Sequence, residues 1–141
     1  MLRSRPATDM SEHERRRLDA NSTFVELRIP ADPAFVRIAR LAAGDMGGRI
    51  GLSVDELDDV RLAVDEVCAT LIAAGGQVLQ LRMQTQDRAL LIEGWMPDAV
   101  APTVPSELSE MLLRALVDSC VFTSADGGAG FEMCKRACEI A

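Results

Sequence analysis

Lysine is nearly absent from this chain of 141 residues, because Lys135 is the only lysine among its 15 lysine and arginine residues. A phosphate-binding loop of the form G-x-x-x-x-G-K and an upstream lysine Schiff base are therefore excluded. None of the 4 cysteines forms a C-x-x-C pair and His13 is the only histidine, so the spacing disfavours a Cys/His zinc site. No apolar run reaches the roughly 18 residues needed to span a bilayer, and we predict no metal site.

Positive charge is also scarce, since the net charge is −7 and the body of the chain shows no basic patch. This balance disfavours nucleic-acid binding and favours a partner with a basic surface. The absence of a secretory segment predicts a reduced, cytoplasmic protein with free thiols. Redox-active thiols are an alternative, although Cys134 and Cys138 lie too far apart along one strand to form a disulfide. The four cysteines are Cys68, Cys120, Cys134 and Cys138.

Length and patterning predict a polar tail over 1–21 and one folded domain over 22–141. Within the tail, "ERRR" is either a contact patch or simply solvated. The expected order of elements is β-α-α-β-β-α-β-β, with strands near 23–30, 77–84, 88–96, 120–125 and 130–140 and helices near 32–47, 53–74 and 106–119. This order predicts an α+β fold with a single mixed, mainly antiparallel sheet covered on one face by helices.

The central helix is the best-marked element of the sequence. Ser53 and Glu56 form a capping box, and an apolar stripe follows at helical spacing. The stripe consists of Leu57, Val60, Val64, Val67 and Leu71. Glu66 lies off this stripe, on a narrower face that it shares with Thr70. Asp65 falls on another side, where we expect it to pair with Arg61 at i, i+4.

The stretch "VRLAVDEVCATLIAAGG", together with "FVRIAR" and the helix start "LSVDE", resembles RsbW-type anti-sigma factors. These are serine kinases of the GHKL (HATPase) superfamily with the Bergerat fold, and the resemblance covers residues 23 to about 138. The arginine-rich composition is also typical of a high-GC, actinobacterial source. The resemblance implies a homodimer that sequesters a stress or sporulation type sigma factor and is relieved by a STAS-type anti-anti-sigma factor. The alternative that it implies is an active serine kinase that phosphorylates that antagonist.

The resemblance also assigns roles to residues. Glu66 stands where the family's E-x-x-x-N motif has its general base, and Thr70 replaces the asparagine that holds Mg²⁺. Glu93 in "IEGWMPD" stands in for the adenine-recognising aspartate of D-x-G-x-G, without the glycine spacing. The phosphate loop corresponds to "TVPSELSEMLL", which lacks glycine and carries two glutamates. We therefore expect Mg-ATP to bind weakly if at all, and phosphoryl transfer to be impaired.

A partner surface follows from the resemblance as well. Arg40 in "RIAR" matches the family arginine that touches both sigma and anti-anti-sigma factors. Arg37 lies three residues earlier, on the same side of the predicted helix. The alternative is that Arg40 is an ordinary surface arginine.

Overall fold

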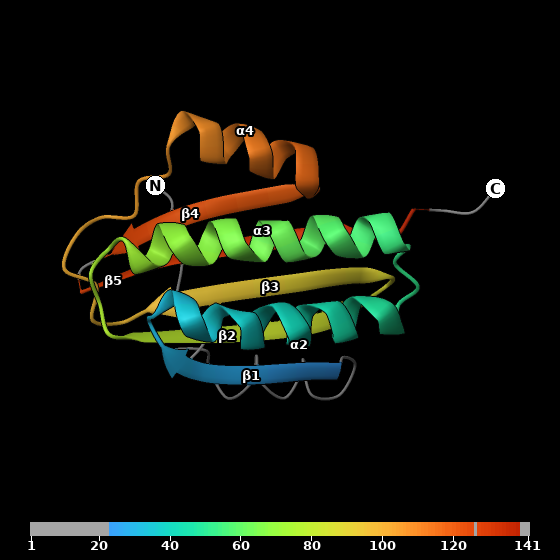
Figure 1. Cartoon of the computed structure of the whole chain (residues 1–141), viewed down its shortest axis with the longest axis horizontal. Helices are drawn as coiled ribbons and strands as arrows, with labels where there is room; N and C mark the ends of the chain where they lie inside the picture. Colours follow the sequence, from blue (N-terminus) through green and yellow to red (C-terminus); the bar gives the residue numbers. More distant parts are fainter. Residues whose placement is uncertain (1–22, 126, 139–141) are drawn as a thin grey trace.

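The computed structural model describes residues 23–125 and 127–138, so the predicted tail lies outside the described residues. The elements follow the predicted order, with an added 3-10 turn (Figure 1). They are β1 (Thr23–Pro30), η2 (Pro33–Phe35), α2 (Val36–Arg49), α3 (Val54–Ile72), β2 (Val78–Gln86), β3 (Ala89–Met96), α4 (Glu107–Leu116), β4 (Ser119–Ala125) and β5 (Gly128–Arg136). The prediction of an α+β fold is confirmed.

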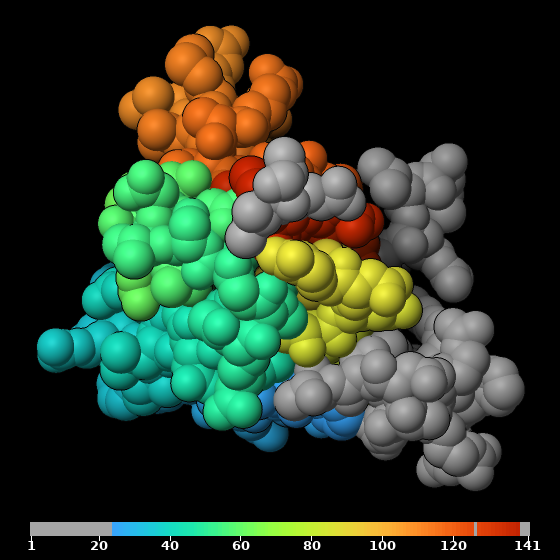
Figure 2. Space-filling view, turned by 90° about the vertical axis from the view of Figure 1, so that its right-hand side faces the viewer, coloured from blue at the N-terminus to red at the C-terminus, as the bar shows by residue number. Residues whose placement is uncertain are grey.

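The five strands form one sheet in the order β1-β2-β3-β5-β4, and every neighbouring pair is antiparallel. The helices all lie on one face of this sheet, with α2 toward β1 and α4 toward β4 (Figures 1 and 2). The two edges of the sheet are therefore β1 and β4. Over the described part of the chain, no helix is long and apolar enough to cross a membrane.

Local capping chemistry sets the starts of the helices. Asp32 accepts a hydrogen bond from the Ala34 amide at 2.9 Å, as its N-cap position predicts, and a 3-10 turn precedes α2. The capping box of α3 is complete, since the Ser53 hydroxyl accepts from the Glu56 amide and the Glu56 carboxylate accepts from the Ser53 amide. Gly47 and Gly48, at the end of the helix predicted over 32–47, lie inside α2, and the chain turns instead at Gly51, where φ is +82°.

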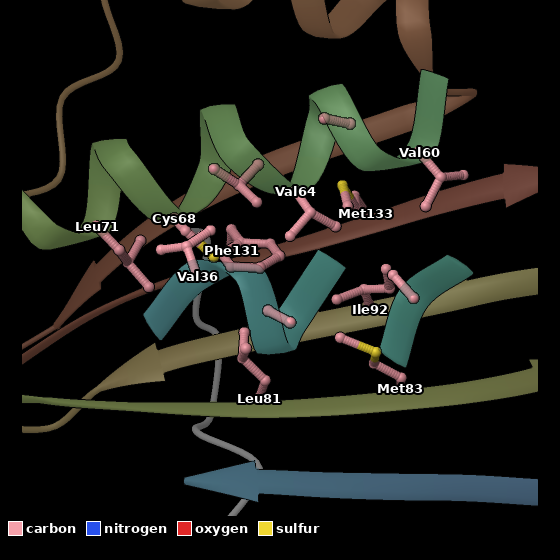
Figure 3. Packing of buried hydrophobic residues seen from close by; sticks show 14 of the residues in the cluster. Val36, Val60, Val64, Cys68, Leu71, Leu81, Met83, Ile92, Phe131 and Met133 are labelled. Carbon is pink, nitrogen blue, oxygen red and sulfur yellow. The ribbon is translucent and has the colours of Figure 1, made fainter. Parts of the chain in front are cut away.

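The apolar stripe of α3 forms the centre of the core, as predicted. Val60, Val64 and Leu71 point from α3 toward the sheet (Figure 3) and are at most 1% exposed. Phe131 from β5 packs beneath them, and a Cβ at Gly94 on the adjacent strand would collide with its ring. Gly94 therefore makes room for Phe131, which gives the glycine of "IEGW" a packing role.

Candidate functional site: the contact between α3 and α4

The predicted catalytic face of α3 is covered by α4. The α4 helix begins at Ser106, whose hydroxyl accepts from the Ser109 amide at 3.0 Å. This cap fixes the first turn, and the Ser109 hydroxyl then donates a hydrogen bond to the Glu66 carboxylate at 2.5 Å. Ser109 is buried and Glu66 is half-buried. The candidate general base is thus already engaged by a hydroxyl of its own chain.

The other end of α4 is held by the single lysine. Lys135 from β5 donates to the Leu116 carbonyl at 2.8 Å and lies 3.4 Å from the Asp59 carboxylate. A cation at a helix C-terminus satisfies carbonyls that have no partner in the helix. Because the start of α4 meets Glu66 and Lys135 bridges its end to Asp59, the two helices run antiparallel. Contacts at both ends hold α4 against α3.

Thr70 lies beside Glu66, as the helical spacing predicts. Its hydroxyl donates to the backbone carbonyl of Glu66 at 2.9 Å, within the same helix. This bond turns the hydroxyl back onto the backbone of α3. The bond uses the hydroxyl proton and leaves the oxygen lone pairs free. Among the described residues, no group of three or more His, Cys, Asp or Glu side chains is arranged to hold a metal ion.

Glu93 does not join the other two candidates. Leu90, Ile92 and Met96, which alternate with Glu93 along β3, belong to the core, so strand alternation directs Glu93 to the face of the sheet away from the helices. There it lies in register with Arg82 on β2 and Glu132 on β5. Burial raises the pKa of Glu93, the charge of Glu132 raises it further and Arg82 lowers it. The sheet separates Glu93 from Glu66, so the structure does not bring these two residues into one nucleotide site.

The start of α4 is acidic. Glu107 and Glu110 lie in its first turn, where negative charge stabilises a helix. The same charges oppose a triphosphate at the helix N-terminus, the position where phosphates commonly bind. Glu107 and Glu110 therefore stabilise α4 and disfavour phosphate binding at its N-terminus.

The predicted partner-binding arginine is tied to α3. The Arg40 guanidinium lies 2.6 Å from the Asp65 carboxylate, and the two side chains are 35% and 43% exposed. The expected pair between Asp65 and Arg61 is wrong, because Arg61 instead pairs with Asp58 at 3.2 Å. Packing of α2 beside α3 brings Arg40 within reach of Asp65, which spacing along one helix could not reveal. Arg37 is exposed.

Sequence reasoning missed Ser109 and Lys135 as parts of this contact between α3 and α4. Ser109 lies 43 positions from Glu66, and Lys135 lies 76 positions from Asp59. The signals present in the sequence were indirect. Ser109 follows a serine N-cap at the third position of the helix, and Lys135 is the only lysine in the chain.

Comparison with known proteins shows the family to which this chain belongs. Residues 29–137 match the histidine kinase-like ATPase domain, so the chain belongs to that family. More particularly, it is similar to the serine-protein kinase RsbW of Bacillus subtilis (strain 168), with 35% identity over 52 residues. That alignment covers 37% of this chain and 32% of the relative. A second RsbW, from Bacillus velezensis, is 35% identical over 49 residues, covering 35% of this chain and 31% of that protein. The chain thus matches about a third of the length of these curated relatives.

A solved structure shows the same fold. The crystal structure of the RsbU and RsbW domains of a Mycobacterium tuberculosis protein superposes with a TM-score of 0.65 at 14% sequence identity. The superposition covers 81% of this chain and 32% of the solved chain. Its low identity limits this likeness to the fold.

Proposed function

We propose that this chain is an RsbW-type anti-sigma factor that captures a stress or sporulation type sigma factor without needing ATP. The observation that carries the proposal is the hydrogen bond from Ser109 to Glu66. A kinase of this family needs the Glu66 carboxylate to accept a proton from a substrate serine, and here an internal serine occupies it. Thr70 stands at the Mg²⁺ position in place of the family asparagine, with a shorter side chain and a weaker dipole than an asparagine carbonyl. Phosphoryl transfer depends on positioning and metal electrostatics, and this exchange weakens the second.

The proposed docking surface is the exposed side of α2. Arg40 is half-exposed, and Ile38 and Leu41 on the same helix are 44% and 66% exposed. A partner carboxylate can replace Asp65 on Arg40 while the partner's apolar side chains cover Ile38 and Leu41. Arg37 lies beside them on the exposed side of the helix. Release by a STAS-type anti-anti-sigma factor that competes for this surface, and a homodimeric cytoplasmic protein, are parts of the same proposal.

A pair of substitutions tests the surface. Arg40→Ala removes the proposed contact, whereas Asp65→Ala removes only the internal partner and leaves the guanidinium free. Both lose the same ion pair, which at this exposure contributes at most about 1 kcal/mol to folding. We expect the sigma factor that co-purifies from the native cytosol to bind Arg40→Ala at least about tenfold more weakly. Asp65→Ala should bind it as well as wild type or better, and equal losses in both variants would contradict this docking surface.

The second candidate function is an active serine kinase acting on the anti-anti-sigma factor. The hydrogen bond from Ser109 to Glu66 also favours this function. It shows that the Glu66 carboxylate can accept from a serine hydroxyl, and Glu66 is half-exposed and so within reach of a substrate. Mg-ATP discriminates between the two functions. A working site stabilises the fold by about 2.7 kcal/mol at ligand 100-fold above its dissociation constant. We expect no thermal shift with millimolar Mg-ATP and no phosphate transfer to the antagonist.

A further inference from the structure

The two edges of the sheet differ in how they are protected against pairing with another strand. The β1 edge (Thr23–Pro30) carries Glu26 and Arg28 and ends in a proline. The β4 edge, with sequence SCVFTSA, has neither a charge nor a proline. Charges and prolines are the usual means by which an edge strand is kept from pairing. Within the described part of the chain, only the end of β4 is covered, because the Thr103 amide donates to the Ser124 hydroxyl at 2.9 Å. The part of β4 before Ser124 is therefore a place where another strand can add.

A cavity lies along this unguarded edge. Its volume is about 320 Å³, and it lies between α4 and β4. The α4 helix projects past β4 in both views, so it forms a wall beside the edge (Figures 1 and 2). The apolar lining comes from Leu113, Val117, Cys120 and Phe122. Thr103, also in the lining, is buried, and its hydroxyl has no hydrogen-bond partner among the residues that the structure describes.

Two opposite charges on the α4 wall face this cavity. Glu110 and Arg114 line it at a spacing of i, i+4, and among the described residues neither side chain has an ion-pair or hydrogen-bond partner. Four helical residues rise about 6 Å, which is close to the distance of about 6.8 Å between alternate residues of a strand. Because α4 connects to β4 through two residues, the chain reverses and Arg114 lies toward the start of β4. Glu110 then lies toward its end.

From this geometry we infer that the groove between α4 and β4 binds an extended segment of a partner polypeptide, which adds antiparallel to β4. Antiparallel pairing places a basic side chain near the beginning of the segment beside Glu110. An acidic side chain two residues later, on the same face of the segment, lies beside Arg114. An apolar side chain two residues further along that face lies beside Val117 and Cys120. A second copy of β4 fits poorly, because it would bring a second α4 against the same edge. The inference is independent of the proposed sigma capture, since it uses none of the α2 surface.

Two synthetic peptides test the inference on the full chain. The first, TKTETVT with blocked ends, places lysine, glutamate and valine on one face in the proposed order. The second, TETKTVT, has the charges exchanged and is the matched control. We expect the wild-type chain to bind the first peptide about fivefold or more tightly than the second, by NMR titration. Two partly exposed ion pairs supply a difference of this size. Amide shifts and slowed exchange should be concentrated in Ser119–Thr123.

The two charges can also be exchanged on the protein. A double variant with Glu110→Arg and Arg114→Glu keeps the net charge and alters two exposed side chains, so circular dichroism should show it folded. It should reverse the preference and bind TETKTVT more tightly. The inference is overturned if neither peptide binds at millimolar concentration or if wild type does not prefer TKTETVT. It is also overturned if the double variant keeps the wild-type preference, or if the shifts lie away from β4.

Discussion

Replacing Ser109 with alanine should release the start of α4 from α3. A hydrogen bond to a charged group contributes about 1.5–3 kcal/mol net. Because Glu66 is half-exposed, water can partly replace the serine, and the lower figure applies. Alanine has the better helix propensity by about 0.5 kcal/mol, which offsets part of the loss. We therefore expect Ser109→Ala to lower the free energy of unfolding by about 1 kcal/mol, or about 4 °C in Tm.

The coupling between Ser109 and Glu66 separates their hydrogen bond from helix propensity. In a double-mutant cycle with Ser109→Ala and Glu66→Ala, we expect the two effects to be non-additive by about 1 kcal/mol or more. Hydrogen exchange should speed up in α4 and remain slow in the core strands. Ser119→Ala, at an exposed serine with no side-chain partner among the described residues, is the control and should change little. Additivity within about 0.5 kcal/mol would refute the role given to this contact.

Two further predictions concern the scaffold. Backbone and side-chain hydrogen bonds from Ser53 and Cys138 lower the pKa of Glu56 from 4.5 to about 2. The carboxylate therefore stabilises the fold above pH 4.5, and this contribution is lost as the pH falls toward 2. Measured in urea, the free energy of unfolding of Glu56→Gln should be lower than that of wild type near pH 6. It should also change less between pH 4.5 and 2 than that of wild type, and the same pH dependence in both proteins would contradict the assignment. Gly94→Ala should lower Tm sharply because its Cβ meets a buried ring. Gly48→Ala, in open space on α2, should raise it slightly.

Most of the fold could be predicted because its signals are local. The capping box at Ser53 and the apolar spacing of α3 each depend on residues within a few turns of one another. Apolar residues that alternate between turn residues mark where the strands lie along the chain. The end of α2 was misplaced because the glycine pair at 47 and 48 was read as a helix stop. A Cβ at Gly47 would collide with Leu52 and Leu57, so tertiary packing accounts for a small residue inside the helix.

The candidate site was predicted less completely, because its contacts join distant parts of the chain. Helical spacing correctly placed Glu66 and Thr70 on one face. It could not reveal that Ser109 would meet Glu66, or that Asp65 would pair across helices with Arg40. Glu93 was matched to a motif by order along the chain. Strand alternation directs its side chain to the opposite face of the sheet.

ATP independence of partner capture is the central claim, and one titration tests it most directly. The sigma factor that co-purifies with the chain is titrated into wild type and into Glu66→Ala, with and without Mg-ATP. Because Glu66 is engaged by Ser109 and lies apart from the α2 surface, we expect all four dissociation constants to agree within a few fold. Tight capture that requires Mg-ATP in wild type and is lost in folded Glu66→Ala would contradict the account and establish a working nucleotide site.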